Sequence, residues 1–111
     1  MGDNTSMNAE YATAQPSRDE IDAMQEPVVL EFGTAWCGWC RGAQPFIARA
    51  LEDHPPVRHI KVEDGPGRPL GRSFGIKLWP TLVFLKNGQE VARVTRPNGP
   101  DAIRAALEKL G

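Results

Sequence analysis

Hydrophobic and polar positions follow two different periods along the chain, which predicts both strands and helices. The run Val28–Phe32 is apolar on both faces except at Glu31, as in a central strand that is buried on both sides. Residues 57–63 alternate between apolar and polar side chains and predict a second strand. Residues 81–85 and 90–95 predict two more strands, which an Asn-Gly turn joins into a hairpin.

Helical spacing and helix-end signals occupy the segments between these strands. Ser17 with Glu20 three residues later forms a capping box, which predicts a short helix. Pro45 falls inside the longest helical segment, where we expect a kink. The predicted helices cover residues 18–24, about 37–54, 70–74 and about 100–110.

The order of these elements predicts an α/β fold. We expect strands joined through helices to pair in parallel and the terminal hairpin to pair antiparallel. The expected architecture is a mixed central β-sheet flanked by helices on both faces. Residues 1–16 are polar and are expected to form a flexible N-terminal segment, with a short edge strand at residues 11–13. Residues 17–111 are expected to form a single domain.

Composition and charge exclude several classes of protein. Of the 111 residues, 41% are hydrophobic, but no apolar run approaches the ~20 residues of a membrane span. The net charge of −1 gives no electrostatic basis for binding nucleic acid or an anionic membrane. The first fifteen residues do not resemble a signal peptide, which favours a cytoplasmic location. A periplasmic location stays open for a protein whose signal peptide has been removed.

The two cysteines, Cys37 and Cys40, point to chemistry rather than to a structural disulfide. A bond between residues three apart closes a ring too short to constrain the unfolded chain. A four-ligand zinc site would need a second pair of cysteines. A metal site completed by His54 and His59 is a less favoured alternative, because both histidines are expected at the surface. An inert cysteine pair is also less favoured, because chance rarely places two cysteines at this spacing at a helix start. We therefore expect no metal.

The motif Trp36-Cys37-Gly38-Trp39-Cys40 follows the central strand and begins a helix. At the helix N-terminus, Cys37 meets unpaired backbone N–H groups and the positive end of the helix dipole, with Gly38 at the helix start. Its thiol pKa is therefore expected below the ordinary value of ~8.5. Cys40 is expected to be more buried and to keep its proton. Cys37 would attack a substrate disulfide, and Cys40 would then resolve the mixed disulfide.

Together with Trp79-Pro80-Thr81, this motif resembles the thioredoxin superfamily over residues 17–111. The resemblance implies a thioredoxin fold. It also makes Cys37 similar to the family's nucleophile, Cys40 to its resolving cysteine and Trp36 to the indole beside them.

The resemblance extends to two prolines. Pro45 resembles the proline that kinks the family's active-site helix. Pro80 resembles the cis-proline of the family, in which the backbone of the preceding residue, here Trp79, pairs with bound substrate. A trans-proline that opens a strand is the alternative.

Glu31 resembles the family's buried aspartate, which implies a proton acceptor that helps Cys40 to become a nucleophile. Desolvation is expected to raise the pKa of Glu31 toward neutrality, where such a role is effective. Two alternatives stay open: Glu31 reaches solvent at the sheet edge, or it pairs with Lys61.

The chain also departs from thioredoxins proper. Gly38-Trp39 stands where they have Gly-Pro, Gly33 stands where they often have a second tryptophan, and Trp79 replaces a small aliphatic residue. The three tryptophans, Trp36, Trp39 and Trp79, are expected to form an apolar docking surface. Core packing is the alternative for Trp36 and Trp79.

The expected function is a thiol–disulfide oxidoreductase that reduces protein disulfides by dithiol–disulfide exchange through Cys37 and Cys40. We expect a monomer without a bound cofactor, because the dithiol is the redox carrier. Its expected partners are disulfide-containing client proteins and a thioredoxin reductase or other thiol electron donor. The alternatives are an exported disulfide oxidase or isomerase, and a non-catalytic thioredoxin-fold binding module.

Overall fold

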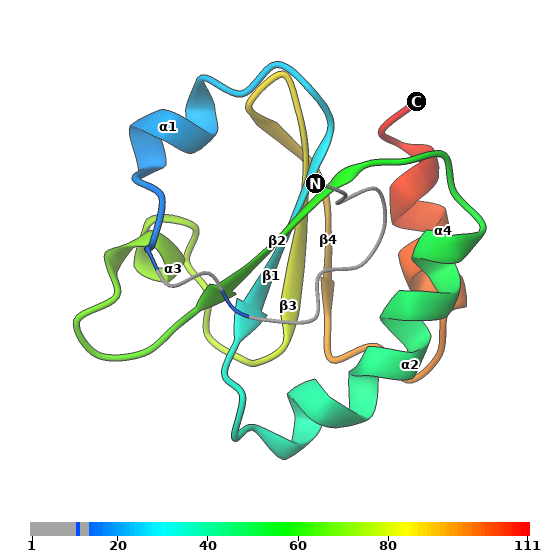
Figure 1. Cartoon of the computed structure of the whole chain (residues 1–111), viewed down its shortest axis with the longest axis horizontal. Helices are drawn as coiled ribbons and strands as arrows, with labels where there is room; N and C mark the ends of the chain where they lie inside the picture. The colour runs from blue at the N-terminus through cyan, green and yellow to red at the C-terminus, as the bar shows by residue number, and fades with distance from the viewer. Residues whose placement is uncertain (1–10, 12–13) are drawn as a thin grey trace.

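The computed structural model describes Tyr11 and residues 14–111, and Figure 1 shows its elements. Each element lies within about two residues of its predicted position. The strands are β1 (Val28–Gly33), β2 (Arg58–Glu63), β3 (Thr81–Lys86) and β4 (Gln89–Thr95). The helices are α1 (Arg18–Asp22), α2 (Gly38–Glu52), α3 (Pro69–Ser73) and α4 (Asp101–Glu108).

The four strands form one mixed sheet in the order β2-β1-β3-β4. β1 pairs in parallel with β2 and antiparallel with β3, and β3 pairs antiparallel with β4. The mixed sheet is therefore confirmed, but the rule that helix-linked strands pair in parallel holds only for β1 and β2. After the short α3 the chain enters β3 at the end of the sheet where β2 finishes, so that β3 runs antiparallel to β1. β3 lies on the other edge of β1 from β2 and does not pair with β2.

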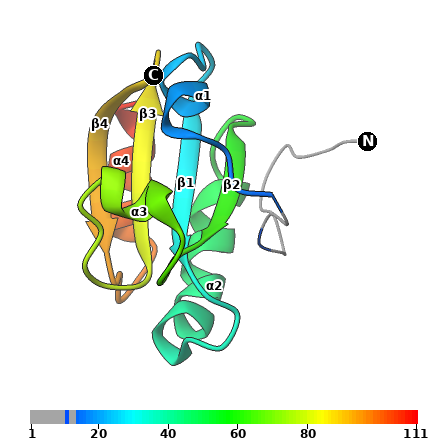
Figure 2. The ribbon, with the colours of Figure 1, turned by 90° about the vertical axis from the view of Figure 1, so that its left-hand side faces the viewer.

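Two hydrophobic cores cover the two faces of the sheet, and alternation along β1 divides its side chains between them. α2 and α4 pack on one face, where Val29 of β1 and Phe84 of β3 are fully buried. α1 and α3 pack on the other, where Leu30 and Phe32 are buried. Figure 2 shows α1 and α3 in front of the sheet and α2 and α4 behind it. Helices therefore flank both faces, as the sequence predicts, and β1 is buried throughout.

Local signals in the sequence account for the helix boundaries. The predicted capping box is present, since Ser17 Oγ accepts from Glu20 N–H and the Glu20 carboxylate accepts from Ser17 N–H. α2 continues through Pro45, and the predicted kink stays a prediction. At the start of α4, Pro100 occupies the N-cap position.

The N-terminal segment falls largely outside the described residues. The edge strand predicted at residues 11–13 lies there except for Tyr11, which is not part of a strand. Gln15 is attached to the domain, because its side chain donates to Glu63 O over 3.2 Å and accepts from Leu70 N over 3.0 Å. The flexibility predicted for residues 1–16 stays a prediction.

The β3–β4 turn gives a test of this packing. Gly88 has a φ of +75°, and a Cβ there would overlap the backbone carbonyl of Asp22. We predict that Gly88→Ala lowers the free energy of unfolding by about 1–3 kcal/mol in urea denaturation. Gly42 lies in α2 with open space around it, so that Gly42→Ala should raise stability by up to about 1 kcal/mol. Equal effects of the two substitutions would contradict this account.

Candidate active site

The two cysteines occupy the first turn of α2, directly after the loop that leaves the buried strand β1. Cys37 is the N-cap residue, and the backbone N–H of Cys40 donates to its Sγ over 3.1 Å. Both thiols are free. Cys37 retains 8% exposure and Cys40 only 1%, which agrees with the prediction that Cys40 is the more buried of the two.

The surroundings of Cys40 favour its protonated form. Burial raises the pKa of the Cys40 thiol to about 12, and its hydrogen bond and charge interaction with Cys37 act in the same direction. Hydrogen bonds from the backbone of Thr34 and from the side chain of Tyr11 lower the pKa but do not offset the burial. Cys40 therefore keeps its proton at neutral pH, as predicted, and needs help to become a nucleophile.

Behind this turn, the buried Glu31 carboxylate lies among polar side chains. His59 Nε2 lies 2.8 Å from one carboxylate oxygen, and Gln44 Nε2 donates to the other over 2.9 Å. Lys61 Nζ lies 3.9 Å from that second oxygen and donates to Gln44 Oε1 over 3.1 Å. We call Glu31, Gln44, His59 and Lys61 the polar cluster. The alternative in which Glu31 pairs with Lys61 is thus present, and the one in which it reaches solvent is wrong.

The polar cluster lowers the pKa of Glu31, so the predicted shift toward neutrality is wrong. Burial raises this pKa, but the hydrogen bond and charge of His59, the charge of Lys61 and the hydrogen bond from Gln44 outweigh it. The prediction considered only desolvation and placed His59 at the surface, whereas His59 is buried on β2. Glu31 is therefore a carboxylate at neutral pH.

The tryptophans lie around the cysteine-bearing turn at different depths. Trp36 and Trp39 are 70% and 60% exposed, which excludes core packing for both. Trp79 is half-buried, meets the Trp36 ring edge-on at 5.7 Å between centroids, and donates from Nε1 to Asp64 Oδ2 over 2.9 Å. The Trp79-Pro80 bond is cis, as the resemblance implies. The Trp36–Trp79 contact thus brings this segment beside the cysteine loop.

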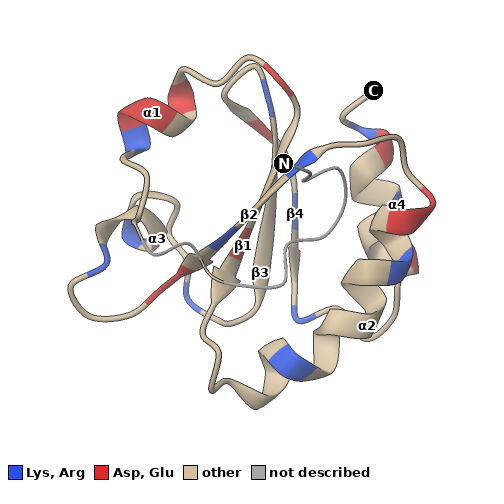
Figure 3. Cartoon of the chain, viewed as in Figure 1, with Lys and Arg blue, Asp and Glu red and all other residues tan. Residues whose placement is uncertain are grey.

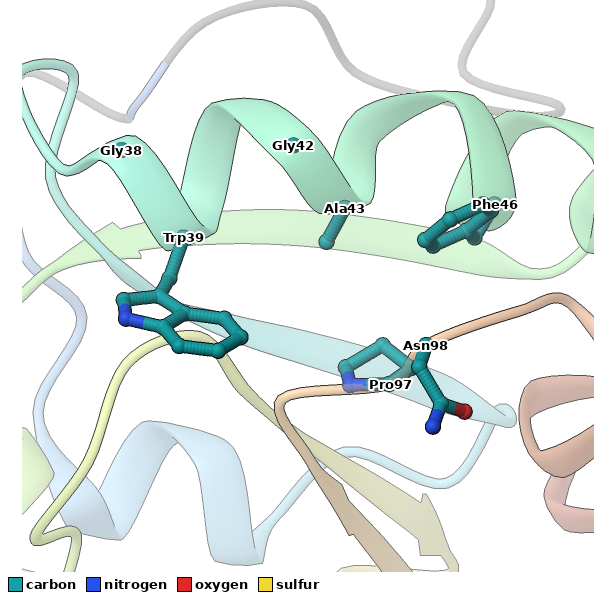
Figure 4. A pocket seen from close by; sticks show the side chains of 7 residues that line it. All are labelled: Gly38, Trp39, Gly42, Ala43, Phe46, Pro97 and Asn98. Carbon is teal, nitrogen blue, oxygen red and sulfur yellow. The ribbon is translucent and has the colours of Figure 1, made fainter.

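Arg96 connects Trp39 with the backbone before the cis-proline. Its guanidinium lies 4.7 Å from the centroid of the Trp39 ring and donates to Trp79 O over 2.8 Å. Trp39 also lines a pocket of about 490 Å³ that runs along α2. Figure 4 shows that its wall includes Phe46 on α2, with Pro97 and Asn98 opposite. A largely apolar surface therefore continues from the cysteine loop along α2.

Charge and possible metal ligands add less to the site. Acidic residues gather on α1, in the layer on the other side of the sheet from α2 (Figure 3). In the part of the chain that the structure describes, no group of three or more His, Cys, Asp and Glu side chains could hold a metal ion. In the same part, no helix has the length and hydrophobicity to cross a membrane.

The geometry of the cysteine turn defines a class of protein. One cysteine caps a helix and keeps some exposure, the second is buried one turn later, and an exposed aromatic surface lies beside them. Such an arrangement performs thiol–disulfide exchange.

Comparisons with known proteins identify the family within this class. The thioredoxin family model matches residues 9–109, and the chain belongs to the thioredoxin family. It is 32% identical to thioredoxin H9 of Arabidopsis thaliana over 98 residues, which cover 85% of this chain and 70% of that protein. It is 33% identical to thioredoxin-1 of Saccharomyces cerevisiae over 89 residues, which cover 80% and 85%.

Among solved structures, reduced thioredoxin 2 of Pseudomonas aeruginosa PAO1 is similar to this chain with a TM-score of 0.83 and 54% identity. The match covers 94% of this chain and 96% of that one. Together with the geometry of the Cys37–Cys40 pair, these relatives show that the chain is a thiol–disulfide oxidoreductase with a thioredoxin fold.

Sequence reasoning missed several residues that the structure places at the site. Lys61, which the sequence analysis already named as an alternative partner, pairs in register with Glu31. His59 lies two positions earlier on β2, so strand alternation could have placed this histidine on the same face, beside the carboxylate. No comparable signal marked Tyr11 or Arg96, because their contacts depend on how distant loops approach the cysteine turn.

The polar cluster makes stability depend on pH. Because the pKa of Glu31 is lower in the folded than in the unfolded chain, its contribution is present at neutral pH. It is lost as pH falls from the ordinary glutamate value of ~4.3 through the folded value. We predict that Glu31→Gln lowers the free energy of unfolding by about 3 kcal/mol at neutral pH, and that its difference from the wild type shrinks in acid.

Urea denaturation across pH measures this effect. Glu108→Gln, at an exposed position of α4, is the matched control and should change stability by no more than about 0.5 kcal/mol. A Glu31→Gln variant as stable as the wild type at neutral pH would contradict the assignment of an ionised, buried carboxylate.

Proposed function

We propose that this protein reduces disulfide bonds of client proteins, with Cys37 as the attacking cysteine and Cys40 as the resolving one. The hydrogen bond from Cys40 N–H to Cys37 Sγ is the observation that carries this proposal. This backbone N–H points at the sulfur of the more exposed cysteine, where it stabilises the negative charge of the Cys37 thiolate.

In the first step, the Cys37 thiolate attacks one sulfur of the client disulfide. A bond forms between Cys37 Sγ and that sulfur, the client S–S bond breaks, and the second client sulfur leaves as a thiolate that takes up a proton. The remaining exposure of Cys37 supports its role as the attacking sulfur, since Cys40 beside it is closed to a protein substrate.

In the second step, Cys40 loses its proton and attacks Cys37 Sγ. The mixed disulfide breaks, the client leaves as a second thiol, and the enzyme holds a Cys37–Cys40 disulfide. Two electrons pass from the dithiol to the client, and no other carrier is required. We therefore propose that the protein uses no bound cofactor.

We assign Glu31 to this second step with a role that its lowered pKa allows. A carboxylate with a low pKa is a weak acceptor for the proton of a thiol with a pKa of about 12. Gln44 Nε2, however, donates to Glu31 Oε2 over 2.9 Å and to Cys40 O over 2.8 Å. Glu31 is thus a positioning residue that fixes the turn carrying Cys40.

We propose that clients dock on the surface formed by Trp36, Trp39 and Trp79 together with the backbone at Pro80. Two exposed indoles give apolar contact area, and aromatic side chains are common anchors of protein interfaces. Gly38, at the start of α2, has no side chain, and the space around it is open, because nothing lies within 4 Å of a Cβ placed there. A client chain can therefore approach Cys37 over the helix start.

The partners and location follow from this reaction. The oxidised protein has to be reduced again by a thioredoxin reductase or another thiol electron donor. We propose that it works as a monomer in the cytoplasm, where thiols are kept reduced. The exported oxidase or isomerase and the binding module are the alternatives that experiment has to distinguish.

Substitution of each cysteine tests the proposed roles. With a disulfide-bonded protein such as insulin as substrate, Cys40→Ser should accumulate a covalent complex through Cys37, because the second step is blocked. Cys37→Ser should form none, and both variants should lose reductase activity with dithiothreitol by at least about 100-fold. Non-reducing electrophoresis with mass spectrometry detects the complex.

The binding module and a reversed assignment of the two cysteines predict different results. A binding module would hold its partner equally well in both variants and without a covalent bond. Trapping by Cys37→Ser in place of Cys40→Ser would reverse the two assignments.

A further inference from the structure

An aromatic side chain from the N-terminal segment reaches the cysteine site. Tyr11 precedes α1, and its hydroxyl donates to Thr34 O over 3.2 Å in the loop between β1 and α2. The side chain is half-buried. Tyr11 is the single tyrosine of the chain, and none of the roles proposed above uses it.

Gly33 provides the space in which Tyr11 and Cys40 meet. A Cβ at residue 33 would overlap Cys40 Sγ and would lie 3.0 Å from Tyr11 Oη. The hydroxyl and the thiol therefore lie on the same side of the end of β1, and each shifts the pKa of the other. The absence of a side chain at Gly33 thus lets a residue 22 positions earlier contact the resolving cysteine.

The Tyr11 ring is held by a contact with the polar cluster. Lys61 Nζ lies 4.6 Å from the centroid of the ring, and the same ammonium group donates to Gln44 and lies near Glu31. The ionisable groups around the hydroxyl are therefore Glu31 on β1, Lys61 on β2, and Cys37 and Cys40 at the start of α2.

The environment of Tyr11 makes its hydroxyl a donor and not a base. Burial raises the pKa of Tyr11 far above its ordinary value, and the charge of Glu31 and the interaction with Cys40 raise it further. The phenol thus keeps its proton throughout the pH range of thiol chemistry. Its hydrogen can rotate about the C–O bond between two acceptors, the Thr34 carbonyl and Cys40 Sγ.

We propose that Tyr11 is a catalytic residue of the second exchange step, in which its hydroxyl donates a hydrogen bond to Cys40 Sγ as that sulfur becomes a thiolate. The inference rests on the proposed dithiol mechanism. A thiolate is a stronger acceptor than the neutral Thr34 carbonyl, so the hydroxyl turns to the sulfur when charge develops there.

The mixed disulfide is the state in which this donor matters most. Once Cys37 is bonded to the client, its charge and its hydrogen bond no longer oppose ionisation of Cys40, while burial still does. The hydrogen bonds from Thr34 and Tyr11 then favour the thiolate. Cys40 gives up its proton to solvent and displaces the client sulfur, which takes a proton back, so that charge and protons balance over the step.

Removal of the hydroxyl alone tests the proposal. Tyr11→Phe keeps the ring over Lys61, and stopped-flow reaction of the reduced protein with DTNB separates the two steps as two releases of thionitrobenzoate. We predict that the second release slows about fivefold, which corresponds to about 1 kcal/mol, the net contribution of one typical hydrogen bond. Its pH midpoint should move upward by about half a pH unit or more, while the first release stays within about twofold.

Ser73→Ala is the matched control, because Ser73 Oγ also donates to a backbone carbonyl, Leu70 O, but lies on α3. It should leave both releases unchanged. An unchanged second release in Tyr11→Phe would overturn the role of Tyr11 and leave the dithiol mechanism intact. Equal slowing of both releases would also overturn it, because this would indicate a general loss of structure. Wild-type protein that released no thionitrobenzoate would instead overturn the proposed function.

Discussion

The hydrogen bond from the Cys40 backbone to Cys37 Sγ is the interaction on which this site depends. This N–H group belongs to the first turn of α2 and has no backbone partner within the helix. It donates to the sulfur that we assign as the nucleophile, so the same contact caps the helix and stabilises the reactive group. β1 is buried along its whole length and holds the loop that leads to Cys37 in a fixed position. The two hydrophobic cores therefore hold the chemistry in place as well as the fold.

One helical turn separates two very different cysteine environments. Cys37 lies at the rim beside an exposed indole, where a client disulfide can approach. Cys40 lies within, next to a tyrosine hydroxyl and above a carboxylate whose charge is balanced by buried partners. The attack by Cys37 thus requires exposure, whereas the second step requires neighbouring groups that favour ionisation of the buried Cys40 thiol. The polar cluster, Gly33 and Tyr11 all lie near Cys40 and not near the exposed indole beside Cys37.

The sequence predicted the elements and the two cysteines because their signals are local. Hydrophobic period, the capping box at Ser17 and the C-x-x-C spacing involve residues near one another in the chain. The direction of β3 was not predictable in this way, since it depends on the end of the sheet at which the chain enters β3 after α3. The pKa of Glu31 was predicted in the wrong direction, because the partner that reverses it, His59, comes from another strand.

A redox titration against glutathione or dithiothreitol, followed by tryptophan fluorescence, tests the central claim most directly. Trp36 directly precedes the nucleophile and should report the state of the cysteine pair. The account predicts one two-electron transition at about −270 mV, the thioredoxin value, which Cys37→Ser abolishes. A transition at about −180 mV or above would contradict the proposed reducing direction, and the absence of any transition would contradict dithiol exchange itself.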